Sequence, residues 1–286
     1  MEIDSLRMPD AHSHGLATFD DTVSSMLPLD RLTRERDKLR AFYEAAKPYP
    51  HIIMDGFFDP SVLDRAVAEF PTPDQRDWSR FDTDSEIKET SRGIANLSPF
   101  VQMLLLQLCS EPFLQQIRYI TGINDLIWDP MYFGAGLHES PRGGWLNVHA
   151  DWTGHAHLPL KRRLNLILYL NRDWEEDWGG ALELCDPETG EAGASVSPIF
   201  NRAVLFPTTD KTLHGFPRPL TCPANRTRKS ISIFYWSADP EALKTATQIR
   251  FLPGTRETRM KAFARSLVPP ILLRTARQMS RGARGA

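Results

Sequence analysis

The stretch Asn147-Val-His-Ala-Asp151 combines the alternation of a β-strand with two side chains that bind metal ions. Because successive side chains of a strand point to opposite faces, His149 and Asp151 are expected to project from the same face. One imidazole beside one carboxylate leaves a metal ion short of a protein ligand. His214, in the later segment Leu-His-Gly-Phe, can supply it.

Two histidines and one carboxylate occupy one side of a metal ion and leave the other side open, as in non-haem Fe(II) oxygenases. The segment from Arg228 to Trp236 has the composition of a strand, and its period of two places Arg228 and Ser230 on one face. A permanently charged guanidinium beside a hydroxyl suits the far carboxylate of a dicarboxylic co-substrate. Each residue alone has an ordinary structural explanation, but their joint order on predicted strands favours a site.

The order His149-Ala-Asp151, His214, Arg228-Lys-Ser230 resembles the 2-oxoglutarate- and Fe(II)-dependent oxygenases, in their prolyl-hydroxylase-like branch. The resemblance covers roughly residues 49–237, and its specificity lies in the order of the pieces. Three further segments are similar to that branch: Tyr49-Pro-His-Ile-Ile-Met-Asp-Gly-Phe-Phe58, Arg162-Arg-Leu-Asn-Leu-Ile-Leu-Tyr-Leu-Asn171 and Gly179-Gly-Ala-Leu-Glu-Leu184.

The resemblance implies that His149, Asp151 and His214 hold Fe(2+), with 2-oxoglutarate and O2 as co-substrates. The implied reaction couples decarboxylation of 2-oxoglutarate, to succinate and CO2, with hydroxylation of a second substrate. Related halogenases carry a small residue in place of the carboxylate, so Asp151 favours hydroxylation or a desaturation variant over halogenation.

The same resemblance assigns the co-substrate contacts. Arg228 would pair with the C5 carboxylate of 2-oxoglutarate, and Ser230 and Tyr169 would support that contact. Asn165 shares the face of Tyr169 and would touch 2-oxoglutarate or fill the interior. Arg226 shares the face of Arg228 and is the alternative anchor.

Leu146 marks a departure from the family pattern. Collagen-type and oxygen-sensing prolyl hydroxylases carry a tyrosine three residues before the first metal ligand, whereas Leu146 stands there in this chain. Their substrate pocket therefore does not transfer to this chain, and the substrate, whether a small molecule or a peptide, is not specified by the sequence.

Length and composition fit one large domain with appendages. The chain has 286 residues, 41% of them hydrophobic, and a net charge of −2. We expect a polar segment and helix at 1–48, the dioxygenase domain at 49–240 and a basic helical tail at 241–286. The three cysteines lie far apart and no secretory leader is recognisable, which together predict a cytoplasmic protein without disulfides.

The pattern of elements predicts a mainly β fold, a double-stranded β-helix (jelly roll) with N-terminal helices packed outside it. Apolar spacing and proline positions predict helices over 30–47, 59–70, 98–109 and 112–121. Residues 71–97 have the composition of a long irregular loop that could line the substrate entrance. Strands are expected at 52–54, 127–137, 145–151, 163–170, 180–184, 196–200, 202–207 and 229–236.

Other polar and aromatic residues receive weaker assignments. His155 and His157 lie close behind Asp151 and are expected on the substrate side or, more favourably, in solvent. His51 and His138 have no metal-ligand spacing, which favours structural roles. Three aromatic residues are expected at the mouth of the barrel, where they would stack on a ring or pack against the rim: Tyr132, Trp145 and Trp152.

The C-terminal part has a distinct charge. From Lys244 onward it holds ten basic residues and one acidic residue, Glu257. Residues 245–286 could dock on the acidic body, or contact a membrane surface or polyanion. Two other functional hypotheses remain open from the sequence: a cupin-like metal enzyme that uses no keto-acid, and a non-catalytic adaptor that works through this tail.

Overall fold

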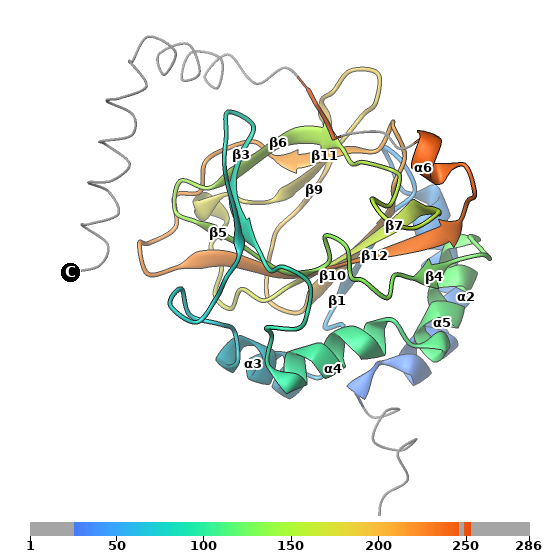
Figure 1. The fold of residues 1–286 in the computed structure, drawn as a ribbon, viewed down its shortest axis with the longest axis horizontal. Helices are drawn as coiled ribbons and strands as arrows, with labels where there is room; N and C mark the ends of the chain where they lie inside the picture. The colour runs from blue at the N-terminus through green and yellow to red at the C-terminus, as the bar shows by residue number, and fades with distance from the viewer. Residues whose placement is uncertain (1–25, 246–248, 253–286) are drawn as a thin grey trace, which may run out of the picture.

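The structure is a computed structural model, and it describes residues 26–245 and 249–252. They form one long, folded β-sheet with helices along one side (Figure 1). Most of the expected N-terminal polar segment and of the basic tail lies outside the described residues. No helix in the described ranges is long and apolar enough to cross a membrane.

Thirteen strands form the sheet. In chain order they are β1 (Ile52–Asp55), β2 (Ser79–Asp82), β3 (Glu86–Thr90), β4 (Ile127–Trp128), β5 (Gly136–Pro141), β6 (Trp145–Ala150), β7 (Leu160–Tyr169), β8 (Leu182–Cys185), β9 (Ala192–Val196), β10 (Arg202–Pro207), β11 (Leu213–Phe216), β12 (Thr227–Ala238) and β13 (Arg250–Phe251). The helices are α2 (Leu29–Ala45), α3 (Pro60–Ala68), α4 (Pro99–Leu108), α5 (Glu111–Thr121), the short 3-10 helix η1 (Glu176–Trp178) and α6 (Ala242–Thr245).

The sheet has two halves that face each other. One half runs β1-β10-β7-β12-β5, and the other runs β6-β11-β8-β9. Strand β3 joins them, because it pairs with β5 through Glu89 and Thr90 and with β6 through Glu86 and Ile87. This arrangement confirms the predicted jelly roll, and its interior is bounded by β12 and β7 on one side and by β6 and β11 on the other.

The N-terminal helices cover the outer face of the β7–β12 half, as predicted (Figure 1). They start where the sequence indicates, since the Asp59 and Ser98 side chains accept backbone N–H bonds in the first turns of α3 and α4. The hydroxyl of Tyr235, on β12, donates to the carbonyl of Leu108 at the end of α4 over 2.9 Å. The helices therefore fix the β12 strand from behind.

Strand β12 divides its side chains between two environments. Ile231, Ile233 and Tyr235 pack into the core beneath the helices, whereas Arg228, Ser230, Ser232 and Phe234 line a cavity inside the barrel. This alternation is the period-two pattern that the sequence shows. A strand of this kind carries core packing on one face and polar chemistry on the other.

Four details of the predicted secondary structure were wrong. Residues 71–97 contain β2 and β3 and are not an irregular loop. Residues 127–137 do not form one strand, because the Asp129 carboxylate accepts the backbone N–H groups of Met131 and Phe133 and closes a turn between β4 and β5. Residues 196–200 lie mostly beyond β9, which ends at Val196, and β11 was not predicted as a strand.

Candidate metal centre and co-substrate site

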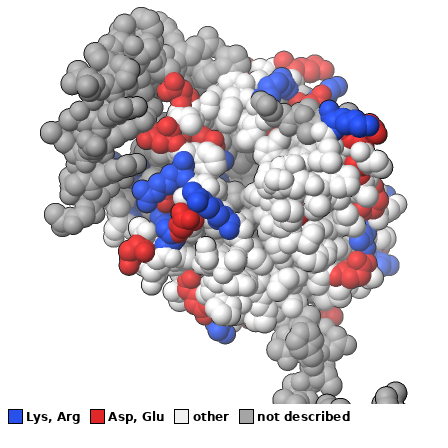
Figure 2. Space-filling view, in the orientation of Figure 1, with Lys and Arg blue, Asp and Glu red and all other residues white. Residues whose placement is uncertain are grey.

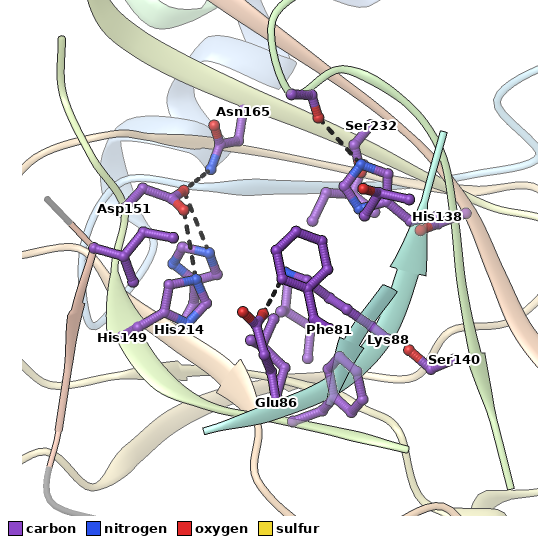
Figure 3. A pocket seen from close by; sticks show the side chains of 18 of the residues that line it. Phe81, Glu86, Lys88, His138, Ser140, His149, Asp151, Asn165, His214 and Ser232 are labelled. Carbon is purple, nitrogen blue, oxygen red and sulfur yellow. Dashed lines mark hydrogen bonds and ion pairs between the residues drawn. The ribbon is translucent and has the colours of Figure 1, made fainter. Parts of the chain in front are cut away.

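His149 and His214 lie opposite each other on neighbouring antiparallel strands, β6 and β11. Their ring centroids are 4.5 Å apart, and both side chains are buried. Asp151 follows directly after β6 and turns back toward them (Figure 3). One potential ligand atom from each of the three lies within 4.8 Å of the others, so the structure brings together the residues that the sequence singled out.

Hydrogen bonds and burial set the protonation of this cluster. Nδ1 of His149 lies 2.9 Å from the Asn147 carbonyl and Nδ1 of His214 lies 3.2 Å from the Thr212 carbonyl, so each ring donates there and turns Nε2 toward Asp151. Burial lowers the pKa of His214 to about 4. At neutral pH this imidazole is uncharged, the form that binds a metal ion.

Asp151 is held as a carboxylate. Burial opposes its ionisation, but Arg162 and the two histidines outweigh burial and keep its pKa well below the usual value. Arg162 Nη2 lies 3.1 Å from Oδ2, and the Asn165 amide donates to the same oxygen over 2.8 Å. Two imidazoles and one carboxylate, buried together, are a donor set that fits ferrous iron.

Arg162 was not predicted as a site residue. Its guanidinium lies between the rings of Trp152 and Phe234, at 4.4 Å and 3.4 Å from their centroids, and its Nε donates to Asn165 Oδ1 over 2.9 Å. Burial lowers the pKa of Arg162 to about 10, against the opposing effect of Asp151. Arg162 stands in the basic run Lys161-Arg162-Arg163 at the start of β7, so the sequence did not distinguish it from its charged neighbours.

Arg228 is buried on β12, with 6% of its surface exposed. Its Nε donates to the Gly180 carbonyl over 2.8 Å, its Nη2 donates to the Tyr169 hydroxyl over 3.3 Å, and its guanidinium lies 4.3 Å from the Phe216 ring centroid. Among the described residues its contacts are thus a carbonyl, a phenol and rings, and none is a carboxylate. A buried guanidinium with no anion is costly for the fold on its own.

Glycines allow two close approaches in this site. Gly180 has a φ of +78°, and a Cβ there would lie 2.6 Å from Leu220 Cδ2 and 3.0 Å from Arg228 Cδ. Gly215, which follows His214, would place a Cβ 2.8 Å from the carbonyl oxygens of Leu146 and Asn147. Both positions therefore require glycine, one to receive Arg228 and the other to bring β11 against β6.

Of the other residues predicted to contact the co-substrate, some line the cavity, one lies beside Arg228 and one lies away from the cavity. Ser230 is buried and lines the cavity, and Tyr169 is fully buried beside Arg228. Asn165 also lines the cavity, but its amide hydrogen bonds to Asp151. Arg226, the alternative anchor, does not line the cavity, since its guanidinium contacts the Arg172 carbonyl and the Trp178 ring.

The cavity that contains these groups has a volume of about 240 Å³. Its remaining walls include residues that the sequence did not single out, and β2 and β3 supply four of them: Phe81, Glu86, Lys88 and Thr90. His138, predicted to be structural, is also on the wall. Trp152 is at the cavity as expected, whereas Trp145 and Tyr132 are not among its lining residues.

The two histidines behind Asp151 behave differently from each other. His157 is exposed, as predicted. His155 is buried, and the prediction that it faces solvent was wrong: its Nε2 lies 3.1 Å from Asp129 Oδ2 while its Nδ1 accepts backbone N–H bonds from His157 and Leu158. It fixes a turn and provides no metal ligand. His51 is buried and bonds the Tyr49 carbonyl.

Comparison with known proteins agrees with this geometry. Residues 135–236, which include the three clustered residues and Arg228, match the family model of the 2OG-Fe(II) oxygenase superfamily. Egl nine homolog 1 of Rattus norvegicus is 28% identical over 100 residues, 35% of this chain and 27% of the relative. The matched part thus spans about a quarter of the length of that curated relative.

Two solved structures share the fold. A Pseudomonas putida prolyl-4-hydroxylase superposes with a TM-score of 0.50 at 18% identity, covering 70% of this chain and 98% of that one. A Trichoplax adhaerens prolyl hydroxylase, in complex with a hypoxia inducible factor peptide fragment, gives a TM-score of 0.56 at 16% identity, covering 76% and 96%. Residues 135–236 thus resemble the 2OG-Fe(II) oxygenase superfamily, and the barrel has the fold of these two prolyl hydroxylases.

Proposed function

We propose that this chain is an Fe(II)- and 2-oxoglutarate-dependent dioxygenase that hydroxylates a substrate inside the barrel. His149, Asp151 and His214 would hold the iron, and Arg228 would receive the C5 carboxylate of 2-oxoglutarate. When bound, iron and 2-oxoglutarate supply the oxidation: one atom of O2 enters a C–H bond of the substrate, the other enters succinate, and CO2 leaves.

The observation that carries this proposal is the unpaired charge of Arg228. Among the described residues that line the cavity, Arg162 contacts Asp151 and Lys88 contacts Glu86, but Arg228 contacts no carboxylate. A dicarboxylate reaching from the three clustered residues toward β12 would supply the missing anion through charge-assisted hydrogen bonds. Ser230 and Tyr169 would add hydroxyl contacts beside it.

The remaining residues of the site prepare this chemistry. The Nδ1 atoms of the two imidazoles lie against backbone carbonyls, which directs both Nε2 atoms toward Asp151. Arg162 and Asn165 occupy one oxygen of Asp151, which fixes its orientation. The rings that enclose Arg162 keep water away from that contact. The protein therefore positions its ligands before any metal ion binds.

Arg228 also separates this proposal from a cupin-like metal enzyme that uses no keto-acid. Such an enzyme needs the metal ligands alone and gains nothing from a buried cation on the facing strand. An adaptor without catalysis gains nothing from the three clustered residues. Under either alternative, buried polar groups that are unfavourable for folding would have no functional role.

Anaerobic titration of the Fe(II)-loaded protein with 2-oxoglutarate tests the proposal. The visible charge-transfer band of the iron chelate should appear in the wild type, vanish in His149→Ala and weaken in Arg228→Ala. In air, the wild type should release succinate. A wild type that gives neither the band nor succinate would overturn the proposal.

The surroundings of the enzyme are part of the proposal as well. We place it in the cytoplasm, acting on a small-molecule or peptidyl substrate and binding no nucleic acid. The basic segment 245–286, which for the most part lies outside the described residues, would make a peripheral contact with a membrane surface or polyanion. Sedimentation with anionic liposomes, with and without that segment, tests the contact separately from turnover.

A further inference from the structure

An ion pair lies in the cavity wall, on β3. Glu86 and Lys88 are two residues apart, so both side chains leave the same face of the strand, and Lys88 Nζ lies 2.8 Å from Glu86 Oε2. Both line the cavity that also holds His149, Asp151 and His214. Figure 3 shows the pair, with Phe81, on one side of that cavity and the three clustered residues on the other.

The pair is buried but incompletely satisfied. The side chains of Glu86 and Lys88 are 8% and 18% exposed. Among the described residues, Glu86 Oε2 has no partner besides the Lys88 ammonium. Lys88 also lies 5.4 Å from the centroid of the Phe81 ring, an apolar neighbour. Buried ion pairs contribute little net stability compared with apolar side chains of the same size, so a pair left open toward a cavity suggests recognition.

The charges of the cavity restrict what can bind there. The described walls carry three cations, Arg162, Lys88 and Arg228, and two carboxylates, Asp151 and Glu86. Iron and 2-oxoglutarate together add no net charge, which leaves one excess positive charge. A cationic substrate would worsen that excess and an anionic one would reduce it, but only a zwitterion offers an opposite charge to both Lys88 and Glu86.

We propose, on the basis of the oxygenase function above, that Glu86 and Lys88 bind the ammonium and carboxylate groups of a free α-amino acid. The Lys88 ammonium and the Glu86 carboxylate are adjacent on the cavity wall. The ammonium and carboxylate of an α-amino acid are also adjacent, because both are attached to one carbon atom. The side chain of the bound amino acid would then extend past Leu146 toward the metal site, where one of its C–H bonds receives oxygen.

A substrate panel tests this inference. The common L-α-amino acids are added singly to the Fe(II)-loaded protein with 2-oxoglutarate, and succinate is measured in air. For each active amino acid, its N-acetyl derivative and the amine without the carboxylate are compared, and anaerobic calorimetry measures binding directly. We expect at least one amino acid to bind and to raise succinate formation, and both derivatives to fail.

Three variants connect this result to the pair. Glu86→Gln and Lys88→Met should each raise the KM for the amino acid about tenfold or more, because each removes one charged partner. The double variant E86Q/K88M leaves no buried charge unpaired, so it should keep the wild-type melting temperature and still lose the amino acid. Glu188→Gln and Lys211→Met, at exposed positions, serve as charge-matched controls.

The outcomes separate this inference from the proposed function. If the charge-transfer band forms but no amino acid binds, or if the derivatives serve as well as the zwitterion, the amino-acid inference is wrong and the oxygenase stands. Unchanged KM values in both single variants would also overturn it. If the wild type forms no band, the oxygenase proposal itself fails.

Discussion

Two buried arginines, Arg76 and Arg228, lie on opposite sides of the strand pair β5–β12 and have opposite surroundings. Arg76 pairs with Glu139 and, over 2.9 Å, with Glu89, and its guanidinium stacks 4.4 Å from the Trp78 ring centroid. Arg228 is buried to a similar degree and contacts no carboxylate among the described residues. A buried cation that is paired with carboxylates supports the fold, whereas one without an anion marks a place where a ligand completes the structure.

The same contrast appears between neighbours on one strand. Lys229 follows Arg228 on β12 and therefore points the other way, where its Nζ lies 3.0 Å from Glu139. Figure 2 shows basic and acidic side chains intermingled over the side of the barrel where β3 lies in Figure 1. The outward-facing cations Arg76 and Lys229 thus share carboxylate partners, whereas the inward-facing Arg228 has none among the described residues.

Replacing Arg76 should have the largest effect on the fold. Arg76→Met removes the cation that Glu89 and Glu139 share and leaves them only Arg80 and Lys229 as cationic partners. We expect a loss of about 1.5 to 3 kcal/mol in the free energy of unfolding. Urea denaturation at neutral pH measures it. Arg80→Met, which removes a half-exposed partner of Glu89, should cost less than about 1 kcal/mol. Equal losses in the two variants would contradict the assignment.

Replacing a clustered histidine should act on metal binding and leave the charge network untouched. His214→Ala removes one of three donors, and we expect the affinity for a divalent metal ion to fall more than about 100-fold. Calorimetric titration with Mn(II) or Fe(II) measures it. His157→Ala, at an exposed position outside the cluster, is the matched control and should bind metal like the wild type.

Replacing Arg228 should weaken co-substrate binding without destabilising the fold, the reverse of the effect expected at Arg76. Arg228→Met should raise the dissociation constant for 2-oxoglutarate about 10- to 100-fold, because a charge-assisted contact is lost. In the absence of 2-oxoglutarate its melting temperature should be unchanged or higher, since a buried unpaired charge is removed. Arg226→Met is the control for 2-oxoglutarate binding. A large drop in melting temperature with normal co-substrate affinity would reverse the roles of the two arginines.

The smallest expected effect is a dependence of stability on acid. Burial opposes ionisation of Glu139, but Lys229, Thr227 and Arg76 outweigh it and lower its pKa below the usual 4.5. Its contribution to stability is therefore present above that value and is lost as the pH falls through the lower, folded-state pKa. Urea midpoints measured from pH 5 down to pH 3 should fall in the wild type and change less in Glu139→Gln.

The pair of His149 and Asp151, and Arg228, could be predicted from the sequence because each depends on strand periodicity and residue type. His149 and Asp151 need only a strand that ends beside them, and Arg228 needs only the alternation of β12. Their meeting with His214 required a fold in which β6 and β11 pair, and the resemblance to a known family supplied that topology. The core positions of the N-terminal helices followed from helical spacing in the same way.

The β3 wall could not be predicted, for a physical reason. Its residues alternate between two charged environments, with Glu86 and Lys88 inside and Glu89 outside, so no apolar face reveals the strand. Besides the adjacent β2, its hydrogen-bond partners are β5 and β6, which lie far along the chain. Composition alone therefore indicated a loop, and Glu86 and Lys88 were not predicted to line the cavity.

Arg162 and His155 illustrate a second limit. Both look like surface residues in the sequence, and both are buried because aromatic rings and a carboxylate enclose them in three dimensions. Trp152 contributes to the environment of Arg162 from outside its strand. Such enclosure depends on contacts between distant segments, which a local pattern does not encode.

One short strand, β3, carries two duties whose separation would be difficult. Its five residues join the halves of the barrel and also present Glu86 and Lys88 to the interior. Any change of the substrate that the cavity accepts must therefore be made on the strand that also joins the two halves of the barrel. Exchanges confined to the inward side chains, with Ile87 and Glu89 preserved, are the route by which selectivity can diverge while the architecture persists.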